Sequence, residues 1–553
     1  MPTNASKNLL NLSHYYKDRR TPDILDCIAN LSSDEVFTPP ELADKVLDLL
    51  PEEVWSNPDL KWLDPACKTG VFLRQIATRL MIGLRDKIPD EAKRREHIFK
   101  NMLYGMPITR LTALMSRRSV YYAKNAMSEK SVVKFGDNEG NIIFVPMEHD
   151  FNDKGICKYC RVSKDNKLGK READGTLENH AYQFIHLKED TLKKMKFDVI
   201  VSNPPYQFNY GTEGANDSKA YPIYQLFIEQ AIRLNPRYFS FIVPSKWSIG
   251  TKELFSFQKH FLNDPRIAKY YDFIDSSEIF PGTNQEGICY FVWDREKKDK
   301  DVDIYVYRTA SELLEHSVRP MNNGSDTFIR MKDGDSIVQK CLKNKNVKKF
   351  MDQSVTGRAV YGVSGSLIKN KTKKENKYFH TTQEYNTIMI RSLNAEKNET
   401  ARFRWYYVDS NAPFLKKEKI EKWKLCFPKS VGESIYRRTW ICPPDRIFTD
   451  TWLNVFVDTE EQAKNLDSYF KTYLFRYLLL ICCATRNVYR QCYRLVPDLS
   501  EIKNERTGKI GWDSYWTDED LQKLFGITNE ETAFMKNELE MADPKGANEK
   551  EEA

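Results

Sequence analysis

A tetrad of Asn203, Pro204, Pro205 and Tyr206 follows an apolar run, residues 197–202, that has the composition of a β-strand. The exocyclic amine of a nucleobase is a poor nucleophile, because its lone pair is delocalised into the ring. An enzyme that alkylates it must hold the amine with hydrogen-bond acceptors. The Asn203 side-chain oxygen and the Pro204 carbonyl can both accept from that amine, and two prolines keep these acceptors in place. The tetrad therefore predicts methylation of an amino group.

The remaining residue of the tetrad, Tyr206, predicts the physical state of the substrate. A base that has left a duplex loses its stacking neighbours, and an aromatic ring in the loop can replace one of them. No Pro-Cys pair stands at this position. That argues against methylation at cytosine carbon 5, which needs an activated thiolate. The electrophile expected for direct transfer to an amine is S-adenosylmethionine.

Two motifs upstream have the patterns of a cofactor loop and of a helix start. Trp62–Gly70 is a strand and tight loop that leads into helical spacing over residues 71–80. Gly70 lets the backbone approach a ligand closely, and the helix N-terminus presents unpaired N–H groups. Earlier, the segment FTPPELA predicts a helix with Thr38 as N-cap and Pro39 at the first helical position. Neither motif is specific by itself.

Taken together and in this order, the strings FTPPELA, LDPACKTGVF and NPPY resemble adenine-specific DNA methyltransferases of restriction–modification systems, in the gamma-class arrangement. The resemblance covers roughly residues 30–540. It implies an α/β, Rossmann-like S-adenosylmethionine-dependent methyltransferase sheet with a C-terminal α+β target-recognition domain. It also implies transfer to the N6 amine of a flipped adenine in a specific duplex sequence. Cytosine N4 follows the same chemistry, and the asparagine that heads the tetrad favours adenine through the resemblance.

The resemblance further implies a set of site residues. The catalytic residues are Asn203, Pro204, Pro205 and Tyr206. The cofactor-binding residues are Phe37, Thr38, Pro39, Asp64, Pro65, Ala66, Gly70, Phe72 and Asp150. Phe280 precedes the apolar run Ile288–Trp293 and is expected to stack on the base opposite Tyr206. A buried core phenylalanine is an equally good interpretation of Phe280.

Two departures from the family pattern keep alternatives open. Lys68 stands where many relatives have glycine, and Met106 and Pro107 stand where many carry the acid that holds the cofactor ribose. An inactive DNA-binding module is therefore one alternative. A methylase acting on RNA or on protein glutamine is another, since such enzymes share the tetrad. The intact tetrad and the basic, aromatic second half of the chain favour the DNA methyltransferase.

Residues 151–190, inside the expected catalytic domain, contain the spacing of a metal site. Cys157 and Cys160 are followed by His180 and His186. Two thiolates and two imidazoles can close a tetrahedral structural zinc site and order a segment with little apolar content. Two reduced cysteines and two unrelated histidines are the alternative, and the spacing alone does not decide between them.

Changes in composition predict the domain boundaries. We expect an N-terminal extension over 1–30, a catalytic domain over 31–300, a recognition domain over 301–541 and a disordered tail over 542–553. Basic residues beside aromatic ones predict DNA contacts, including one helical stripe with four-residue steps. The predicted DNA-binding residues are Arg358, Arg437, Arg438, Arg486, Arg490 and Arg494. A solvated or salt-bridged surface is the alternative for each of them.

The overall composition bounds the partners and the compartment. The chain has 553 residues and a net charge of +7, which favours a polyanionic partner, and we expect double-stranded DNA. The 11 scattered cysteines and the polar start predict a reduced cytoplasm. The longest apolar stretch, Tyr473–Ala484, is too short for a membrane span and predicts a buried helix. We therefore expect no membrane partner, and we expect a separately encoded cognate restriction endonuclease.

Overall fold

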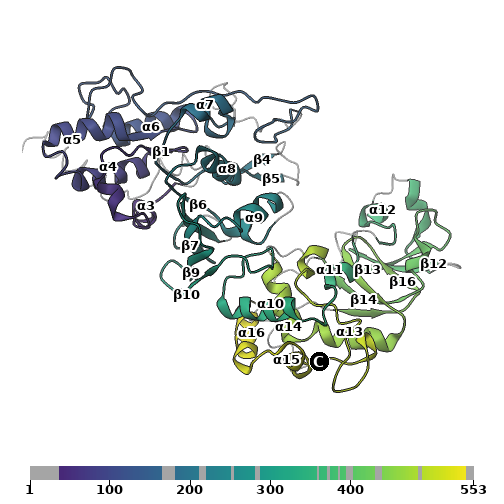
Figure 1. The fold of residues 1–553 in the computed structure, drawn as a ribbon. Coiled ribbons are helices and arrows are strands. Elements are labelled where there is room, and N and C mark those ends of the chain that lie inside the picture. The colour runs from purple at the N-terminus through teal and green to yellow at the C-terminus, as the bar shows by residue number, and fades with distance from the viewer. Residues whose placement is uncertain are drawn as a thin grey trace, which may run out of the picture. The chain divides into compact units, whose positions relative to one another are not determined.

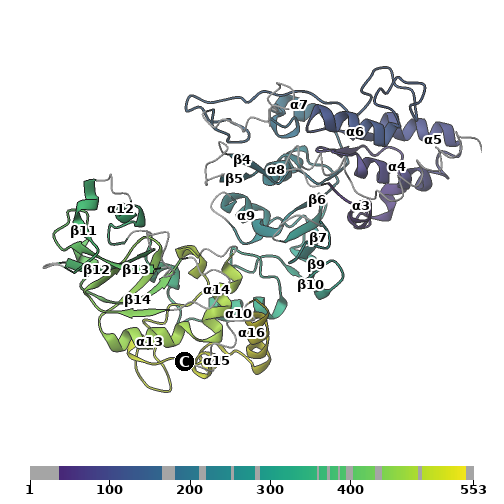
Figure 2. The same ribbon diagram turned by 180° about the vertical axis from the view of Figure 1, so that it is seen from behind.

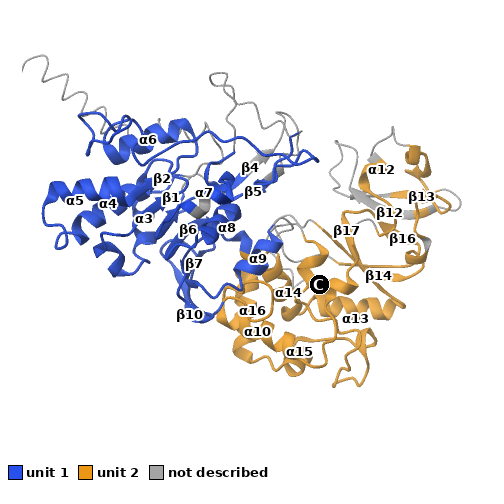
Figure 3. Ribbon diagram, turned by 45° about the horizontal axis from the view of Figure 1, so that its top comes forward, with its two compact units in different colours: residues 1–247, 252–320 blue, residues 248–251, 321–553 orange. Residues whose placement is uncertain are grey.

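The computed structural model describes residues 37–164, 181–210, 219–250, 254–280, 287–357, 360–369, 374–383, 387–393, 403–429, 439–483 and 488–542. The chain divides into two compact units (Figure 3). The first unit comprises residues 1–247 and 252–320, and the second comprises residues 248–251 and 321–553. The predicted extension over 1–30 and the tail beyond residue 542 lie outside the described residues.

An eight-stranded sheet in the order β10-β9-β7-β8-β6-β3-β1-β2 forms the centre of the first unit. Its strands are β1 (Trp62–Asp64), β2 (Leu103–Gly105), β3 (Val199–Ser202), β6 (Tyr238–Pro244), β7 (Ile267–Phe273), β8 (Ile288–Asp294), β9 (Asp301–Tyr307) and β10 (Leu313–Pro320). The neighbours β2, β1, β3 and β6 are parallel, whereas β8 is antiparallel to β6 and β7. The strands β3 and β6 are apolar and buried along almost their whole length, as strands covered on both faces are. The expected Rossmann-like α/β sheet is confirmed.

The edge of this sheet explains why the domain boundary differs from the predicted one. The charged segment 295–300 was expected to connect two domains. Instead, β9 follows it and pairs with β7 in parallel, and β10 pairs with β9. Polar, charged residues suit a turn between strands as well as a linker, so composition alone placed the boundary about 20 residues too early.

Helices cover the sheet of the first unit. They are α3 (Pro40–Leu47), α4 (Val71–Gly83), α5 (Glu91–His97), α6 (Arg110–Tyr121), α7 (Glu189–Lys194), α8 (Tyr224–Leu234) and α9 (Phe255–Phe261). Helices α3, α4 and α6 gather near β1 and β2, and α8 and α9 lie toward β6 (Figures 1 and 2). The helix predicted from residue 71 is confirmed as α4. Helix α3, however, begins at Pro40 with Pro39 as N-cap and no side-chain cap, so the prediction of Thr38 as N-cap was wrong by one residue.

The strand order creates a switch point beside β1. Strand β2 lies on one side of β1 and β3 lies on the other, so the chain winds in opposite directions from this position. Ligands of open α/β sheets bind at the carboxyl ends of strands at such a point. Strand β1 ends at Asp64 and β3 ends at Ser202. The cofactor loop and the tetrad therefore leave the sheet side by side, at the same edge.

The second unit mixes small sheets with helices, which confirms the expected α+β class. One sheet has the order β11-β13-β12-β16 and another has the order β15-β14-β17. The strands are β11 (Phe379–His380), β12 (Thr387–Leu393), β13 (Phe403–Asp409), β14 (Trp423–Pro428), β15 (Trp440–Cys442), β16 (Arg446–Phe448) and β17 (Trp452–Val457). The helices are α10 (Lys332–Lys343), α11 (Met351–Ser354), α12 (Gly365–Lys369), α13 (Glu460–Phe470), α14 (Tyr473–Cys482), α15 (Asp518–Phe525) and α16 (Asn529–Ala542).

The apolar stretch at residue 473 folds as predicted. It forms α14, whose residues Leu474, Phe475 and Leu478 are buried in the core of the second unit. Across the described ranges, every helix is too short or too polar to span a bilayer.

Candidate active site

Two buried side-chain hydrogen bonds join the three sequence motifs. The Asn203 Nδ2 donates to Thr38 Oγ1 at 3.0 Å, across 165 positions of sequence. The Ser202 Oγ donates to Asp64 Oδ1 at 2.8 Å, and the backbone N–H of Ala66 donates to the same oxygen at 3.1 Å. The start of α3, the loop after β1 and the tetrad after β3 thus form one site.

A narrow crevice lies between these three segments. It is lined by Thr38, Asp64, Ala66, Lys68, Thr69, Gly70, Val71, Phe72 and Asn203. Its volume is about 10 Å³, which is room for about one water molecule. The structure therefore brings five of the predicted cofactor-binding residues together with Asn203, and a nucleoside-sized ligand needs the lining to open.

Gly70 sets the direction in which α4 leaves the crevice. It is the N-cap of α4 and has a φ of 75°, in the left-handed region that favours glycine. A Cβ added there would lie 2.8 Å from Val120 Cγ2 and 3.2 Å from Ser116 Cα, both in α6. Glycine is thus needed for the backbone conformation and for the approach of α6. The first helical residues, Val71 and Phe72, line the crevice, where the N–H groups of a helix N-terminus favour an anionic group.

The carboxyl group of Asp64 is the ionisable group at the centre of the crevice. Burial raises the pKa of Asp64 to about 7, although the hydrogen bonds from Ser202 and Ala66 and the charge of Lys68 act in the opposite direction. The carboxyl group therefore changes charge near neutral pH. A cationic ligand beside it favours the carboxylate form.

Four residues of this site were not predicted as site residues: Thr69 and Val71, which line the crevice, and Lys68 and Ser202. Lys68 was noted only as a departure from the family pattern, but its side chain is 6% exposed and lines the crevice. Ser202, the last residue of β3, bonds to Asp64. A serine at the end of an otherwise apolar strand was the available signal for it.

The other predicted residues of the two loops lie around the crevice with differing exposure. Pro65, Pro204 and Pro205 are buried, whereas Phe37 and Pro39 are partly exposed. The carbonyl of Pro39 accepts the first hydrogen bonds of α3. The prolines therefore hold the backbone at the crevice.

The two predicted stacking residues are covered in this conformation. Tyr206 is 8% exposed, and its hydroxyl is buried without a hydrogen-bond partner among the described residues. Burial raises the pKa of Tyr206. Phe280 is 3% exposed and belongs to the core of the first unit with Phe273 and Ile288, which matches the core interpretation. A role for either ring in stacking stays a prediction.

Asp150 is not brought to the crevice. Its carboxylate forms an ion pair with Lys158 at 2.9 Å, and both side chains are about half exposed. It is absent from the lining of the crevice among the described residues. The geometry gives no support to Asp150 as a cofactor-binding residue.

A second group of functional side chains lies next to Asp150. The ligand atoms of His149, Cys157, Cys160 and His186 all lie within 4.8 Å of one another, and we call this group the metal cluster. His149 occupies the place expected for His180, which lies outside the described residues. The predicted ligands all lay at or after the cysteines, whereas His149 lies eight positions before Cys157.

The predicted DNA-binding arginines are only partly described. Arg358, Arg437, Arg438 and Arg486 lie outside the described residues. Arg490 and Arg494 lie in and just after a 3₁₀ turn, Arg490–Tyr493, and not on an α-helix as predicted. The Arg490 Nε donates to the carbonyl of Asp352, and the Arg494 guanidinium donates to the carbonyls of Gln491 and Ile249 at 3.1 and 3.0 Å. Both side chains thus support the local backbone, and their contact with DNA stays a prediction.

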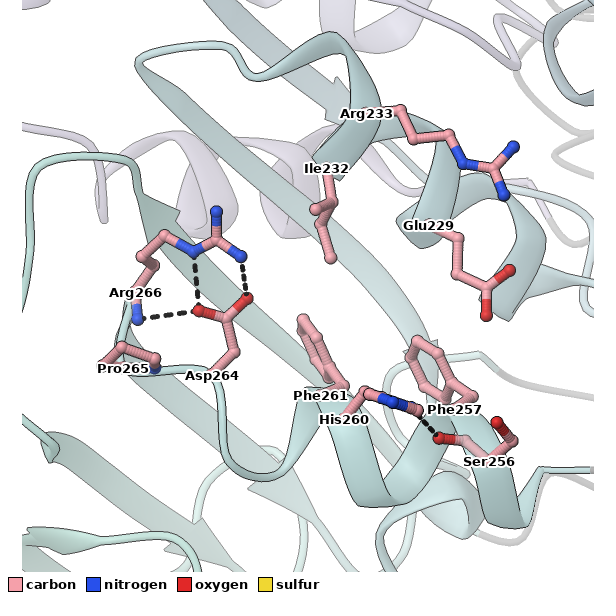
Figure 4. Close-up of a pocket in the computed structure, with 10 residues that line it drawn as sticks. All are labelled: Glu229, Ile232, Arg233, Ser256, Phe257, His260, Phe261, Asp264, Pro265 and Arg266. Atoms are coloured by element: carbon pink, nitrogen blue, oxygen red, sulfur yellow. Dashed lines mark hydrogen bonds and ion pairs between the residues drawn. The ribbon is translucent and has the colours of Figure 1, made fainter.

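A larger cavity lies elsewhere in the first unit, between α8 and α9 (Figure 4). Its volume is about 550 Å³. Asp264 and Arg266 face each other across two hydrogen bonds of 2.7 and 2.8 Å at one side of it. None of the residues predicted for catalysis or cofactor binding lines this cavity, so the small crevice and not the larger cavity is the candidate active site.

Among solved structures, the type IIL restriction–modification enzyme MmeI in complex with DNA has a TM-score of 0.46 and 11% identity, over 94% of this chain and 78% of that chain. A modification subunit of a putative type I restriction enzyme from Vibrio vulnificus YJ016 has a TM-score of 0.31 and 18% identity, and this chain spans only 57% of its length.

The sequence comparisons are more informative. Residues 101–280 match the family described as Eco57I restriction-modification methylase. A protein of Mycoplasma pneumoniae named as an uncharacterized adenine-specific methylase is 40% identical over 301 residues, which are 50% of this chain and 71% of the relative. An identity of this level over most of the relative's length shows that the chain belongs to the family of adenine-specific restriction–modification methylases.

Proposed function

We propose that this protein is a site-specific DNA methyltransferase that transfers a methyl group from S-adenosylmethionine to the N6 amine of adenine in a specific duplex sequence. The observation that carries the proposal is the hydrogen bond from Asn203 Nδ2 to Thr38 Oγ1. The oxygen is the acceptor of an asparagine side chain, and the hydrogen bond from the amide nitrogen to Thr38 fixes the orientation in which that oxygen can accept from a substrate amine. Both residues line the crevice next to the cofactor loop.

The residues of the crevice fit the methionine end of S-adenosylmethionine. The N-terminus of α4 suits a carboxylate, and the Asp64 side chain suits an ammonium or sulfonium cation. When bound, the cofactor supplies an electrophilic methyl group on its sulfonium. The side chains of Lys68 and Phe72 line the crevice and must move to admit it.

On the substrate side, the chain's own groups prepare the amine. The oxygen of Asn203 and the carbonyl of Pro204 accept hydrogen bonds from its N–H groups, which localises the lone pair on nitrogen. Pro204 and Pro205 hold these acceptors rigidly, so that the amine is oriented before transfer. The ring of Tyr206 stacks on the flipped base after the residues that now bury the ring have moved.

Partners follow from the same proposal. Double-stranded DNA is the substrate, and the second unit, with the arginines predicted above, recognises its sequence. A net charge of +7 supports a polyanionic partner. The protein acts in the cytoplasm as the modification component of a restriction–modification system, beside a separately encoded endonuclease.

The test is transfer of labelled methyl groups from S-adenosylmethionine to unmethylated duplex DNA, followed by nucleoside analysis. We expect N6-methyladenine with the unmodified protein and with Asn101→Ala, an exposed asparagine on another element. Asn203→Ala should lose about 100-fold or more in rate while still binding the cofactor. Wild-type rates with Asn203→Ala would contradict the mechanism. Cofactor binding without incorporation into diverse DNAs would point to RNA or protein substrates.

A further inference from the structure

The metal cluster is assembled from two separate segments of the first unit. His149, Cys157 and Cys160 come from residues 149–160, and His186 comes from the 3₁₀ turn Phe184–His186. The sulfur atoms of the two cysteines and the His186 ring are buried, and neither cysteine forms a disulfide. Four nitrogen and sulfur ligand atoms thus converge, three of them on buried residues and one on the partly exposed His149.

The distances between ligand atoms match those around a tetrahedral zinc ion. Cys157 Sγ lies 3.7 Å from His186 Nε2, and Cys160 Sγ lies 3.3 Å from His149 Nδ1. Zinc bonds of about 2.3 Å to sulfur and about 2.0 Å to nitrogen place a sulfur and a nitrogen about 3.6 Å apart in a tetrahedron. Little movement is needed to bring all four atoms to bonding distance of one ion.

The two histidine rings have their ligand nitrogens available. His186 Nδ1 lies 2.8 Å from the carbonyl oxygen of Tyr182, which can only accept. That nitrogen therefore carries the proton, and the lone pair of Nε2 faces Cys157, as in histidines that bind zinc with a carbonyl behind them. The other nitrogen of His149, Nε2, is buried without a hydrogen-bond partner among the described residues.

The backbone around the cysteines is shaped to present both sulfurs. The N–H of Cys157 donates to the carbonyl of Val162 at 2.8 Å, and the N–H of Arg161 donates back to the carbonyl of Cys157 at 3.1 Å. Arg161 has a φ of 66°, a left-handed conformation that is unfavourable for a non-glycine residue and persists where the surrounding structure imposes it. This tight turn places Cys157 and Cys160 on the same side.

We propose that His149, Cys157, Cys160 and His186 bind one zinc ion in a closed, structural site. Thiolates and imidazoles bind zinc in preference to binding magnesium or calcium. Four protein ligands complete the tetrahedral coordination of zinc and leave no open position for catalysis. The site is independent of the proposed methyl transfer. Its function is to fasten the segment 149–164, which has no helix and only isolated bridges, to the turn at His186.

The turn that carries His186 also packs against α8, a helix that follows the tetrad in sequence. The ring of Phe184 stacks on Phe227 of α8 at 5.7 Å, and Gln230 Nε2 of α8 donates to the Phe184 carbonyl at 3.0 Å. The metal ion therefore stabilises the packing of the 149–164 segment on the side of α8. Removal of the metal ion should weaken the contacts of Phe184 with α8 and leave the central sheet in place.

The first experiment measures the metal content of the full chain by elemental mass spectrometry after purification without chelators. We expect one zinc per chain in the unmodified protein, in His180→Ala and in His260→Ala, where His260 is an exposed histidine outside the cluster. His149→Ala and Cys157→Ala should lose the metal. His149→Cys should retain it, because a third thiolate also completes a tetrahedral site.

A second measurement separates a true site from loss of folding. Cobalt added to the metal-free protein should give the visible bands of tetrahedral cobalt with thiolate charge transfer, and these bands should be lost in Cys157→Ala but not in His260→Ala. Absence of zinc and of cobalt binding in the unmodified protein would overturn the proposal. Loss of metal in His180→Ala together with full retention in His149→Ala would overturn the choice of the fourth ligand.

Discussion

Thr38 and Asn203 meet through a single hydrogen bond of 3.0 Å, although 165 positions separate them. Thr38 does not cap α3, which begins two residues later, so its hydroxyl is available to the amide of Asn203. In the proposed mechanism, Thr38 thereby orients the side chain that accepts hydrogen bonds from the substrate amine.

Thr38→Val keeps the shape of the side chain but removes the hydroxyl. The buried amide of Asn203 then loses this partner, at a cost of about 1–3 kcal/mol, and its oxygen is no longer held. We expect kcat for adenine methylation to fall roughly 10- to 100-fold. Thr38→Ser restores the hydroxyl and should recover most of the rate. Equal kcat values for Thr38→Val and Thr38→Ser would show that the Thr38 hydroxyl does not position Asn203.

The affinity for S-adenosylmethionine should depend on pH through Asp64. Burial raises the pKa of Asp64 from its usual 3.8 to about 7 in the folded protein, which favours the neutral acid. The stability associated with that form is lost as pH rises through 7. A bound cation favours the carboxylate, so binding releases a proton. We expect affinity to increase about tenfold from pH 6 to pH 8 and to level off above. Calorimetric titration of the Asp64→Asn variant should show a weaker affinity without this rise.

Lys68→Ala should bind the cofactor more tightly than the unmodified protein. The Lys68 side chain lines the crevice, and its charge interacts with the Asp64 carboxyl, so it competes with the cation of the incoming cofactor. Removing the Lys68 side chain frees space in the crevice and removes the competing charge. We expect this change to lower the Kd for S-adenosylmethionine by roughly 3- to 10-fold. Lys87→Ala, an exposed lysine of the same unit, is the matched control. A weaker affinity in Lys68→Ala would mean that Lys68 binds the cofactor.

Gly70→Ala should destabilise the protein. The added Cβ meets Val120 and Ser116 of α6 at 2.8 and 3.2 Å, and the left-handed backbone at 75° is unfavourable for alanine. Overpacking and backbone strain together predict a loss of about 2–4 kcal/mol in the free energy of unfolding. Urea denaturation measures this loss. Gly136→Ala, where the new Cβ has no neighbour within 4 Å, should leave the midpoint unchanged.

The local features of this chain were readable from its sequence. Proline pairs, the glycine before α4 and the apolar runs of β3 and β8 signal their elements through short-range rules of conformation and burial. The α/β class and the gathering of Thr38, Asp64 and Asn203 in one site were implied by the family resemblance that the three motifs carry together.

The features that were missed are side-chain contacts that lie outside any one helix or strand, and a turn in place of an expected helix. The Ser202 hydroxyl reaches Asp64 across 138 positions, and His149 joins Cys160 from before the cysteine pair instead of after it. The stripe expected from Arg490 and Arg494 assumed a helix, but the chain there forms a 3₁₀ turn held by backbone contacts. The spacing of residues in the sequence predicts which side chains are neighbours within one helix or strand. It does not predict which helices, strands or loops pack against each other.

The crevice draws its whole lining, within the described residues, from segments 38–72 and Asn203, all of them in the first unit. Neighbouring strands lie about 4.8 Å apart. The pairing of β1 with β3 therefore sets the distance between the loop after β1 and the tetrad after β3. In the proposed function, methyl transfer therefore belongs to the first unit and sequence recognition to the second. A descendant that exchanged its second unit for another could acquire a new target sequence and keep its reaction intact.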